Sequence, residues 1–333
     1  NISGDAIISN PDVSTVYEVP LILHQQTLDS KIQQKLGLPV RKPALSDWQK
    51  LVNKIKSKKP KTVEIAIVGK YFGTGDYQIR DSYAALFDAL EHASWFNNAQ
   101  LKTRWINAEK VESAVAKALA DKKEGIEGVR DLIGNPDGII VPIGWGPRGA
   151  EGMIAAASHA RENKIPYLGL CYGMQLAVVG FARNVLWWSD ANTTENAPKT
   201  HHPVIHIIAA QKANLKRRAY GGTMRLGSWD AIVKKDTLSF EFYKKYGQID
   251  EKTGLTSERH RHRYEFNDKF ARDFESKGLI ISAKSKIEGL AEIIEFSKSD
   301  HPFYLGTQGH PEYKSKPLKP HPFFIEFLKA CSK

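Results

Sequence analysis

Short apolar runs alternate with amphipathic stretches along most of the chain from residue 62 onward. Runs rich in β-branched residues and bounded by turn signals predict buried strands at 63–69, 101–106, 138–144 and 165–171. Apolar residues at helical spacing predict the intervening helices at 79–92, 108–119, 150–162 and 173–186. This alternation is typical of an α/β domain with a mainly parallel central sheet flanked by helices.

The first sixty residues lack this alternation of apolar runs and amphipathic stretches. Residues 1–40 contain only two short apolar runs, at 6–8 and 19–23, which are too little for an independent core. The stretch 41–61 is basic and punctuated by prolines, with one helical pattern inside it. We therefore predict three parts: a tail of another domain at 1–40, a basic interdomain linker at 41–61 and the α/β domain at 62–333.

Composition narrows the class of protein. The 333 residues carry a formal charge of +11, but Lys and Arg crowd into 50–61 and 314–319. Because no base-reading motif or aromatic platform accompanies them, we interpret them as solvated charge and predict no nucleic-acid partner. No run approaches the roughly 20 apolar residues of a membrane span, and no signal peptide is visible, so a cytoplasmic location is expected. The chain starts with Asn, and we expect it to be a fragment of something longer.

The sharpest chemical signal is Cys171, which lies where a predicted strand turns into a helix in the run GLCYG (169–173). Flanking glycines let a strand and a helix approach closely around a strained nucleophile. The start of the helix offers free N–H groups and a positive dipole end beside the sulfur, which favour a thiolate. The other cysteine, Cys331, sits near the polar C-terminus, so no disulfide is predicted. We expect no metal site.

A cysteine nucleophile needs a base and a group that orients the base. His310 and Glu312 supply both within one turn, with Pro311 stiffening the backbone between them. A second loop, PIGWG (142–146), follows a predicted strand. The backbone N–H groups of Gly144 and Tyr172 are therefore our candidates for an oxyanion hole.

These motifs together resemble the class I glutamine amidotransferase domain of the CTP synthase family. The resemblance extends nearly end to end. It rests on the blocks at 11–24, 67–71, 81–93, 173–186, 190–195 (DANTTE), 201–205, 221–227 (GGTMRLG), 258–267 (ERHRHRYEFN) and 309–324.

By position, the resemblance implies that Glu195 and Arg263 hold the α-amino and α-carboxylate groups of L-glutamine. An anion and a cation complement a zwitterion, whereas such a pair has no use for a peptide substrate. The resemblance also places Trp145 and Gln175 in the substrate pocket. It implies a Cys171–His310–Glu312 triad that hydrolyses glutamine through a glutamyl thioester.

The resemblance also implies what lies beyond this chain. A synthetase domain in cis would receive ammonia through a tunnel and aminate UTP to CTP with ATP and magnesium, with GTP as an allosteric activator. No cofactor is expected within this fragment, which has no GxxxxGK[ST] phosphate loop. The full-length enzyme would be a homotetramer.

Some positions depart from the family. Its usual PGGFG loop has Ile143 in place of the first glycine, and Trp145 in place of phenylalanine. Tyr172 replaces a leucine, and Gly309 replaces an aromatic residue before His310. If position 143 requires a positive φ, Ile143 is strained and a glycine there raises activity. Two alternatives stay open: an impaired regulatory or assembly module of the same fold, and a cysteine hydrolase with another substrate.

Overall fold

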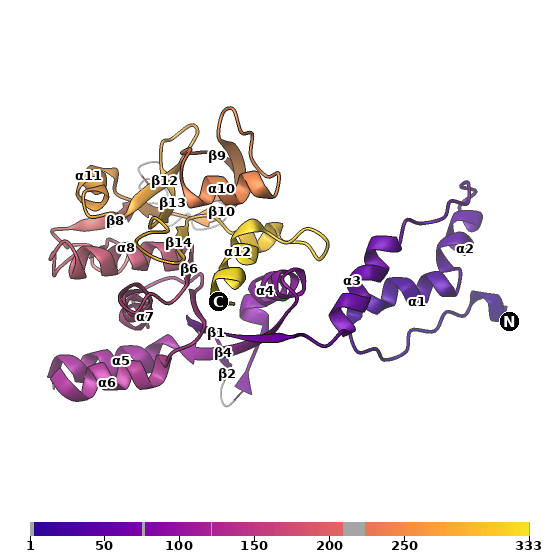
Figure 1. The fold of residues 1–333 in the computed structure, drawn as a ribbon, viewed down its shortest axis with the longest axis horizontal. Helices are drawn as coiled ribbons and strands as arrows, with labels where there is room; N and C mark the ends of the chain where they lie inside the picture. The colour runs from indigo at the N-terminus through magenta and orange to yellow at the C-terminus, as the bar shows by residue number, and fades with distance from the viewer. Residues whose placement is uncertain (1–2, 75–76, 121, 209–223, 333) are drawn as a thin grey trace. The chain divides into compact units, whose positions relative to one another are not determined.

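The chain divides into two compact units, one ending at residue 59 and the other beginning at residue 60. The computed structural model describes residues 3–74, 77–120, 122–208 and 224–332 (Figure 1). The motif at 221–227 therefore lies partly outside the described residues.

The first unit is built of short helices. Its elements are the 3-10 turns η1 (Gly4–Ala6) and η2 (Val16–Glu18) and the helices α1 (Val19–Gln25), α2 (Leu28–Lys35) and α3 (Ser46–Lys56). Trp48 of α3 donates its indole N–H to the carbonyl of Tyr17 at 2.7 Å, and Leu51 and Val52 are buried. The segment 41–61, which we expected to be a linker, thus contributes a packed helix to this unit.

The second unit contains a nine-stranded sheet in the order β10-β9-β12-β13-β14-β6-β5-β1-β4. Five neighbouring strands run parallel: β14 (Tyr304–Thr307), β6 (Tyr167–Leu170), β5 (Gly138–Val141), β1 (Lys61–Gly69) and β4 (Ala99–Asn107). Four strands extend the sheet antiparallel: β13 (Ala291–Glu295), β12 (Ile280–Ser285), β9 (Arg225–Val233) and β10 (Leu255–His262). The predicted α/β class with a largely parallel sheet is confirmed.

Helices lie on both sides of this sheet (Figure 1), and they form two apolar cores with it. One core is formed with α5 (Ala108–Ala120), α7 (Ala150–Glu162), α8 (Tyr172–Asn184) and α11 (Ala271–Glu275). The other is formed with α4 (Ala84–Phe96), α10 (Leu238–Lys245) and α12 (Pro322–Cys331). Helix α6 (Lys122–Ile133), which packs against α5, was not predicted because its sequence is polar and contains two glycines.

Smaller elements complete the unit. They are the β2 (Gly73–Thr74) and β3 (Tyr77–Gln78) pair, the sheet of β7 (Asn192–Thr193), β8 (Pro203–Ile207) and β11 (Tyr264–Phe266), and the turns η3 (Asp81–Tyr83), η5 (Asp268–Phe270) and η6 (Pro311–Lys314). None of the helices in the described ranges is both long and apolar enough to cross a bilayer.

Helices α5 and α7 approach closely at Gly152. A Cβ atom there would lie 2.0 Å from the carbonyl oxygen of Ala108, which is backbone and cannot move aside cheaply. Gly128 in α6 is a matched control, because a Cβ there meets only the Cβ of Ala114 at 3.6 Å, an ordinary contact.

We expect Gly152→Ala to lower the free energy of unfolding by roughly 1–3 kcal/mol through overpacking. Gly128→Ala should leave it unchanged or raise it by up to about 1 kcal/mol, because alanine favours helix. Denaturant titrations of both variants provide the measurement. Equal stabilities for Gly152→Ala and the wild type would contradict the close approach.

Candidate active site

Cys171 lies between the end of β6 and the start of α8, in a conformation that non-glycine residues rarely adopt. Its φ is 52° and its ψ is −99°. Such backbone strain costs on the order of 1–3 kcal/mol and persists only where the surroundings enforce it. The turn is enforced by packing, because a Cβ on Gly173 would lie 1.9 Å from the Val141 carbonyl oxygen. The Cys171 N–H also donates to the carbonyl of Thr307 at 2.7 Å.

His310 and Glu312 lie at the start of η6, just beyond the end of β14, and both are buried. Nδ1 of His310 is 2.7 Å from Oε1 of Glu312. The His310 N–H donates to the carbonyl of Arg259 at 2.7 Å, which fixes the backbone of the ring-bearing residue. The sequence placed these two residues together, and the structure brings them into contact.

The electrostatics of His310 follow from this contact. Burial alone would lower the pKa of the imidazole, but the carboxylate of Glu312 and the nearby sulfur of Cys171 outweigh it and raise the pKa well above its ordinary value. Nε2 of His310 is buried and, within the described part of the chain, makes no hydrogen bond of normal geometry. It is therefore available to a reacting group.

An amide pair that the sequence reasoning missed lies beside the sulfur. Nε2 of Gln308 donates to Sγ of Cys171 at 3.4 Å. Nε2 of Gln175 in turn donates to Oε1 of Gln308 at 3.0 Å and to the carbonyl of Tyr264 at 2.9 Å. Gln308 was detectable only through its place two residues before His310.

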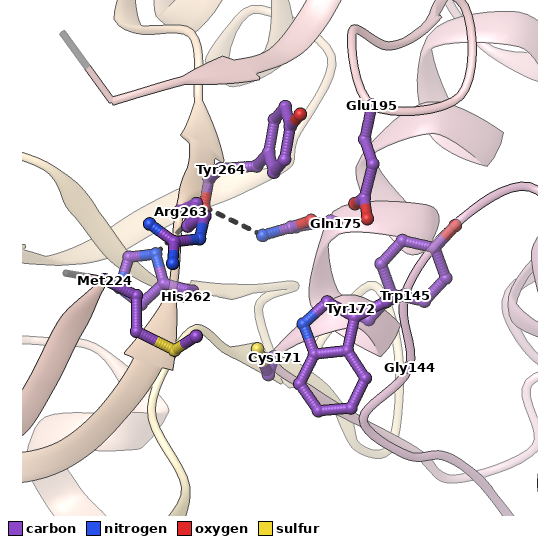
Figure 2. A pocket seen from close by; sticks show the side chains of 10 residues that line it. All are labelled: Gly144, Trp145, Cys171, Tyr172, Gln175, Glu195, Met224, His262, Arg263 and Tyr264. Atoms are coloured by element: carbon purple, nitrogen blue, oxygen red, sulfur yellow. Dashed lines mark hydrogen bonds between the residues drawn. The ribbon is translucent and has the colours of Figure 1, made fainter. Parts of the chain in front are cut away.

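Seven of the predicted site residues line one cavity of about 370 Å³ (Figure 2). They are Gly144, Trp145, Cys171, Tyr172, Gln175, Glu195 and Arg263. Three lining residues were not predicted, namely Met224, His262 and Tyr264. All three belong to motifs that the sequence analysis singled out, but only contact in the folded chain distinguishes them from their neighbours.

Charges of opposite sign face each other across this cavity. Figure 2 shows Glu195 and Arg263 approaching it from opposite sides, with Cys171 at its base. Oε1 of Glu195 accepts the N–H of Gly146 at 2.9 Å. Burial raises the pKa of Glu195, while that N–H and the ammonium of Lys70 oppose the rise. The cavity thus presents a cation and a carboxylate on either side of a thiol.

The two residues whose N–H groups are the predicted oxyanion donors are in contact through the Tyr172 ring. A Cβ on Gly144 would be 3.1 Å from the ring of Tyr172, so the loop and the start of α8 are in close contact. In the described part of the chain, the Gly144 N–H has no hydrogen-bond acceptor. Tyr172 is the first residue of α8, where N–H groups have no intrahelical partner. No cluster of three metal-ligating side chains occurs among the described residues.

Strain at Ile143 was expected only if that position requires a positive φ, and this condition is not met. Ile143 is absent from the described non-glycine residues with positive φ. Its side chain packs against the second apolar core, and its carbonyl accepts the Tyr83 hydroxyl at 3.1 Å. Another departure, Gly309, fits its surroundings, because a Cβ there would lie 2.9 Å from Cβ of Glu258.

The site brings a cysteine at a strained turn, a buried His–Glu pair and a charged cavity together at one edge of an α/β sheet. Comparison with known proteins identifies the family that shares this fold. Residues 78–330 match the family described as glutamine amidotransferase class-I. The chain belongs to this class I glutamine amidotransferase family.

Within the family, the similarity is to CTP synthases. The chain is 46% identical over 330 residues to the CTP synthase of Caldanaerobacter subterraneus subsp. tengcongensis, covering 99% of this chain and 56% of that protein. It is also 46% identical over 332 residues to the CTP synthase of Sulfurisphaera tokodaii, with coverages of 100% and 56%. The chain therefore spans little more than half the length of these relatives.

A solved structure supports the same assignment. It is the glutaminase domain of Trypanosoma brucei CTPS with bound acivicin, which superposes with a TM-score of 0.68 at 33% identity. The match covers 81% of this chain and 93% of that one. The second unit is thus a glutaminase domain of the CTP synthase type.

We expect Ile143→Gly to leave glutaminase activity unchanged or lower it. Glycine is not needed for the backbone conformation at this position, and it removes apolar contacts that hold the loop. The measurement is kcat/KM for glutamine in both forms, with thermal midpoints alongside. A clear rise in kcat/KM in the glycine variant would restore the view that Ile143 impairs the site.

Proposed function

We propose that Cys171, His310 and Glu312 form a triad that hydrolyses glutamine to glutamate and ammonia. The observation that carries this proposal is the buried 2.7 Å contact between His310 and Glu312 beside a cysteine held at a strained elbow. Nucleophile, base and orienting carboxylate are the three roles that such hydrolysis requires.

The chemistry runs in two halves. The thiolate of Cys171 attacks the side-chain amide carbon of glutamine, and the C–N bond breaks as Nε2 of His310 delivers its proton to the departing ammonia. A glutamyl thioester remains on the sulfur. His310, now neutral, takes a proton from water, which attacks the thioester carbon and releases glutamate and the thiol. Throughout both halves, Glu312 stays ionised, accepts a hydrogen bond from Nδ1–H of His310 and stabilises the imidazolium.

The tetrahedral intermediate of each half carries a negative oxygen. The N–H groups of Gly144 and Tyr172 are the proposed hydrogen-bond donors to that oxygen. In other enzymes, each such donor stabilises the transition state by on the order of 3 kcal/mol. Because both groups belong to the backbone, the side-chain change at position 172 does not remove the donor.

Recognition of the substrate is assigned to the charged pair across the cavity. Arg263 would bind the α-carboxylate and Glu195 the α-ammonium of glutamine, in keeping with their signs. Gln175 and Trp145 would line the pocket around the methylenes and the amide. This arrangement favours a free amino acid over a residue within a peptide.

We also propose a role for the domain in a longer enzyme. Ammonia released at Cys171 would pass to a synthetase domain that aminates UTP to CTP with ATP and magnesium, in a homotetramer activated by GTP. The support is the similarity to CTP synthases, of whose length this chain spans 56%.

Ammonia release from glutamine by the purified chain tests the proposal directly. We expect Cys171→Ala to abolish it and Cys331→Ala to preserve it, since Cys331 is packed against Gly138 and burial raises the pKa of its thiol. A diazoketone analogue of glutamine should label Cys171 and not Cys331 in mass spectrometry. Labelling that fell mainly on Cys331 would rule out the assigned nucleophile.

A second test uses pH. The carboxylate of Glu312 raises the pKa of His310, so the ring keeps the proton needed by the departing ammonia up to higher pH. Glu312→Gln removes that charge and should shift the basic limb of the kcat profile to lower pH. It should also lower kcat by about 10²–10⁴-fold, as loss of a triad carboxylate does elsewhere. The control is Glu151→Gln, because Glu151 is an exposed carboxylate that pairs with Arg183. An unshifted profile would exclude Glu312 from the triad.

A further inference from the structure

The loop at 142–146 is held by side chains that come from outside it. Nζ of Lys70 donates to the carbonyls of Trp145 at 2.6 Å and Gly146 at 2.7 Å. The Tyr172 hydroxyl donates to the same Gly146 carbonyl at 2.8 Å. That hydroxyl also accepts from Nδ2 of Asn196 at 2.8 Å. The end of β1 and the first residue of α8 therefore converge on one loop.

Lys70 is a buried lysine, and burial of its ammonium group costs solvation free energy. Only 1% of its surface is exposed, and burial lowers the pKa of its amine to about 8, although Glu195 pulls in the opposite direction. A buried ammonium is unfavourable unless it is well paired. Here it is paired with two loop carbonyls and lies 4.8 Å from the centroid of the Tyr172 ring.

The same two side chains also pack against Gly144. A Cβ on Gly144 would lie 3.1 Å from Cδ1 of Tyr172 and 3.4 Å from Cε of Lys70. The residue that offers the free N–H is thus enclosed by the side chains that bind its neighbours' carbonyls. Those contacts limit how far the Gly144 backbone can move toward either side chain.

We propose that Lys70 and Tyr172 are positioning residues, which fix the 142–146 loop so that the Gly144 N–H is preorganised for the oxyanion. This inference rests on the proposed function of the site. It also gives the Tyr172 side chain a role, because the leucine usual in the family at this position cannot bind the Gly146 carbonyl. The hydroxyl of Tyr172 adds a hydrogen bond to the loop in which Ile143 replaces the first glycine of the family motif.

Loosening of the 142–146 loop should affect kcat more than KM. The negative oxygen exists only in the tetrahedral intermediate and the transition states around it, so a loosened donor lowers kcat more than it raises KM. Thiol reactivity itself does not depend on the loop. Alkylation of Cys171 by iodoacetamide, which forms no oxyanion, should therefore be unaffected.

The experiment compares Tyr172→Phe and Lys70→Met with the wild-type chain and with Lys102→Met, an exposed lysine paired with Glu64. We expect kcat for glutamine to fall by roughly 10-fold in Tyr172→Phe and roughly 100-fold in Lys70→Met, with KM within about threefold. Lys102→Met should behave as the wild type. The iodoacetamide rate at Cys171 should stay within about twofold in all four proteins, since thiolate character controls it.

The outcomes separate two failures. A wild-type chain that releases no ammonia overturns the proposed function and this inference together. An active wild type with unchanged kcat in both variants overturns the positioning role alone. An equal loss of glutaminase and iodoacetamide reactivity places the effect on the thiol and also overturns it. If Lys70→Met does not fold, Tyr172→Phe decides, because it removes one oxygen and keeps the ring and backbone.

Discussion

The close approach of α8 to the sheet is the constraint on which the rest of the site depends. Gly173 lies so near the Val141 carbonyl that a Cβ would be 1.9 Å from the oxygen, and this contact leaves Cys171 in a strained turn with a positive φ between strand and helix. The sulfur therefore lies at the carboxyl edge of the parallel strands. Strands β14 and β5 also end at this edge, and the 142–146 loop begins there. Proposed nucleophile, base and oxyanion loop are neighbours because three parallel strands end side by side.

Around this edge, buried polar groups form connected sets. His310 is held by Glu312 and by the Arg259 carbonyl, and Gln308 links the sulfur to Gln175. A low-dielectric interior strengthens such contacts and penalises any partner left unpaired. The 142–146 loop is held in the same way, because the buried ammonium of Lys70 donates to two of its carbonyls. Preorganisation of this kind places dipoles before the reaction begins, so no reorganisation is needed when charge develops.

The departures from the family illustrate how local changes are accommodated. Ile143 adopts an ordinary backbone conformation and packs against the core, while Gly309 fits against Glu258 where a Cβ would crowd it. Neither position disturbs the contact between His310 and Glu312. Comparison of single residues with the family motif therefore suggested that glutaminase activity is impaired, and the packing at positions 143 and 309 does not support this.

Local pattern alone predicted the fold class and the main strands and helices between 61 and 184 other than α6, and it suggested the grouping of Cys171, His310 and Glu312 that we propose. Buried strands, amphipathic helices and a glycine-flanked elbow each leave a signature within a few residues. The polar helix α6, the cavity residues Met224, His262 and Tyr264, the Gln308 contact and the pairing of Lys70 with the loop left no such signature. Helix α6 was missed because its sequence is polar, whereas the side-chain contacts join residues far apart in the chain, such as Gln308 and Cys171, which are 137 residues apart. Which backbone carbonyl a buried side chain meets is decided by sheet order and helix packing, and these exist only in the folded chain.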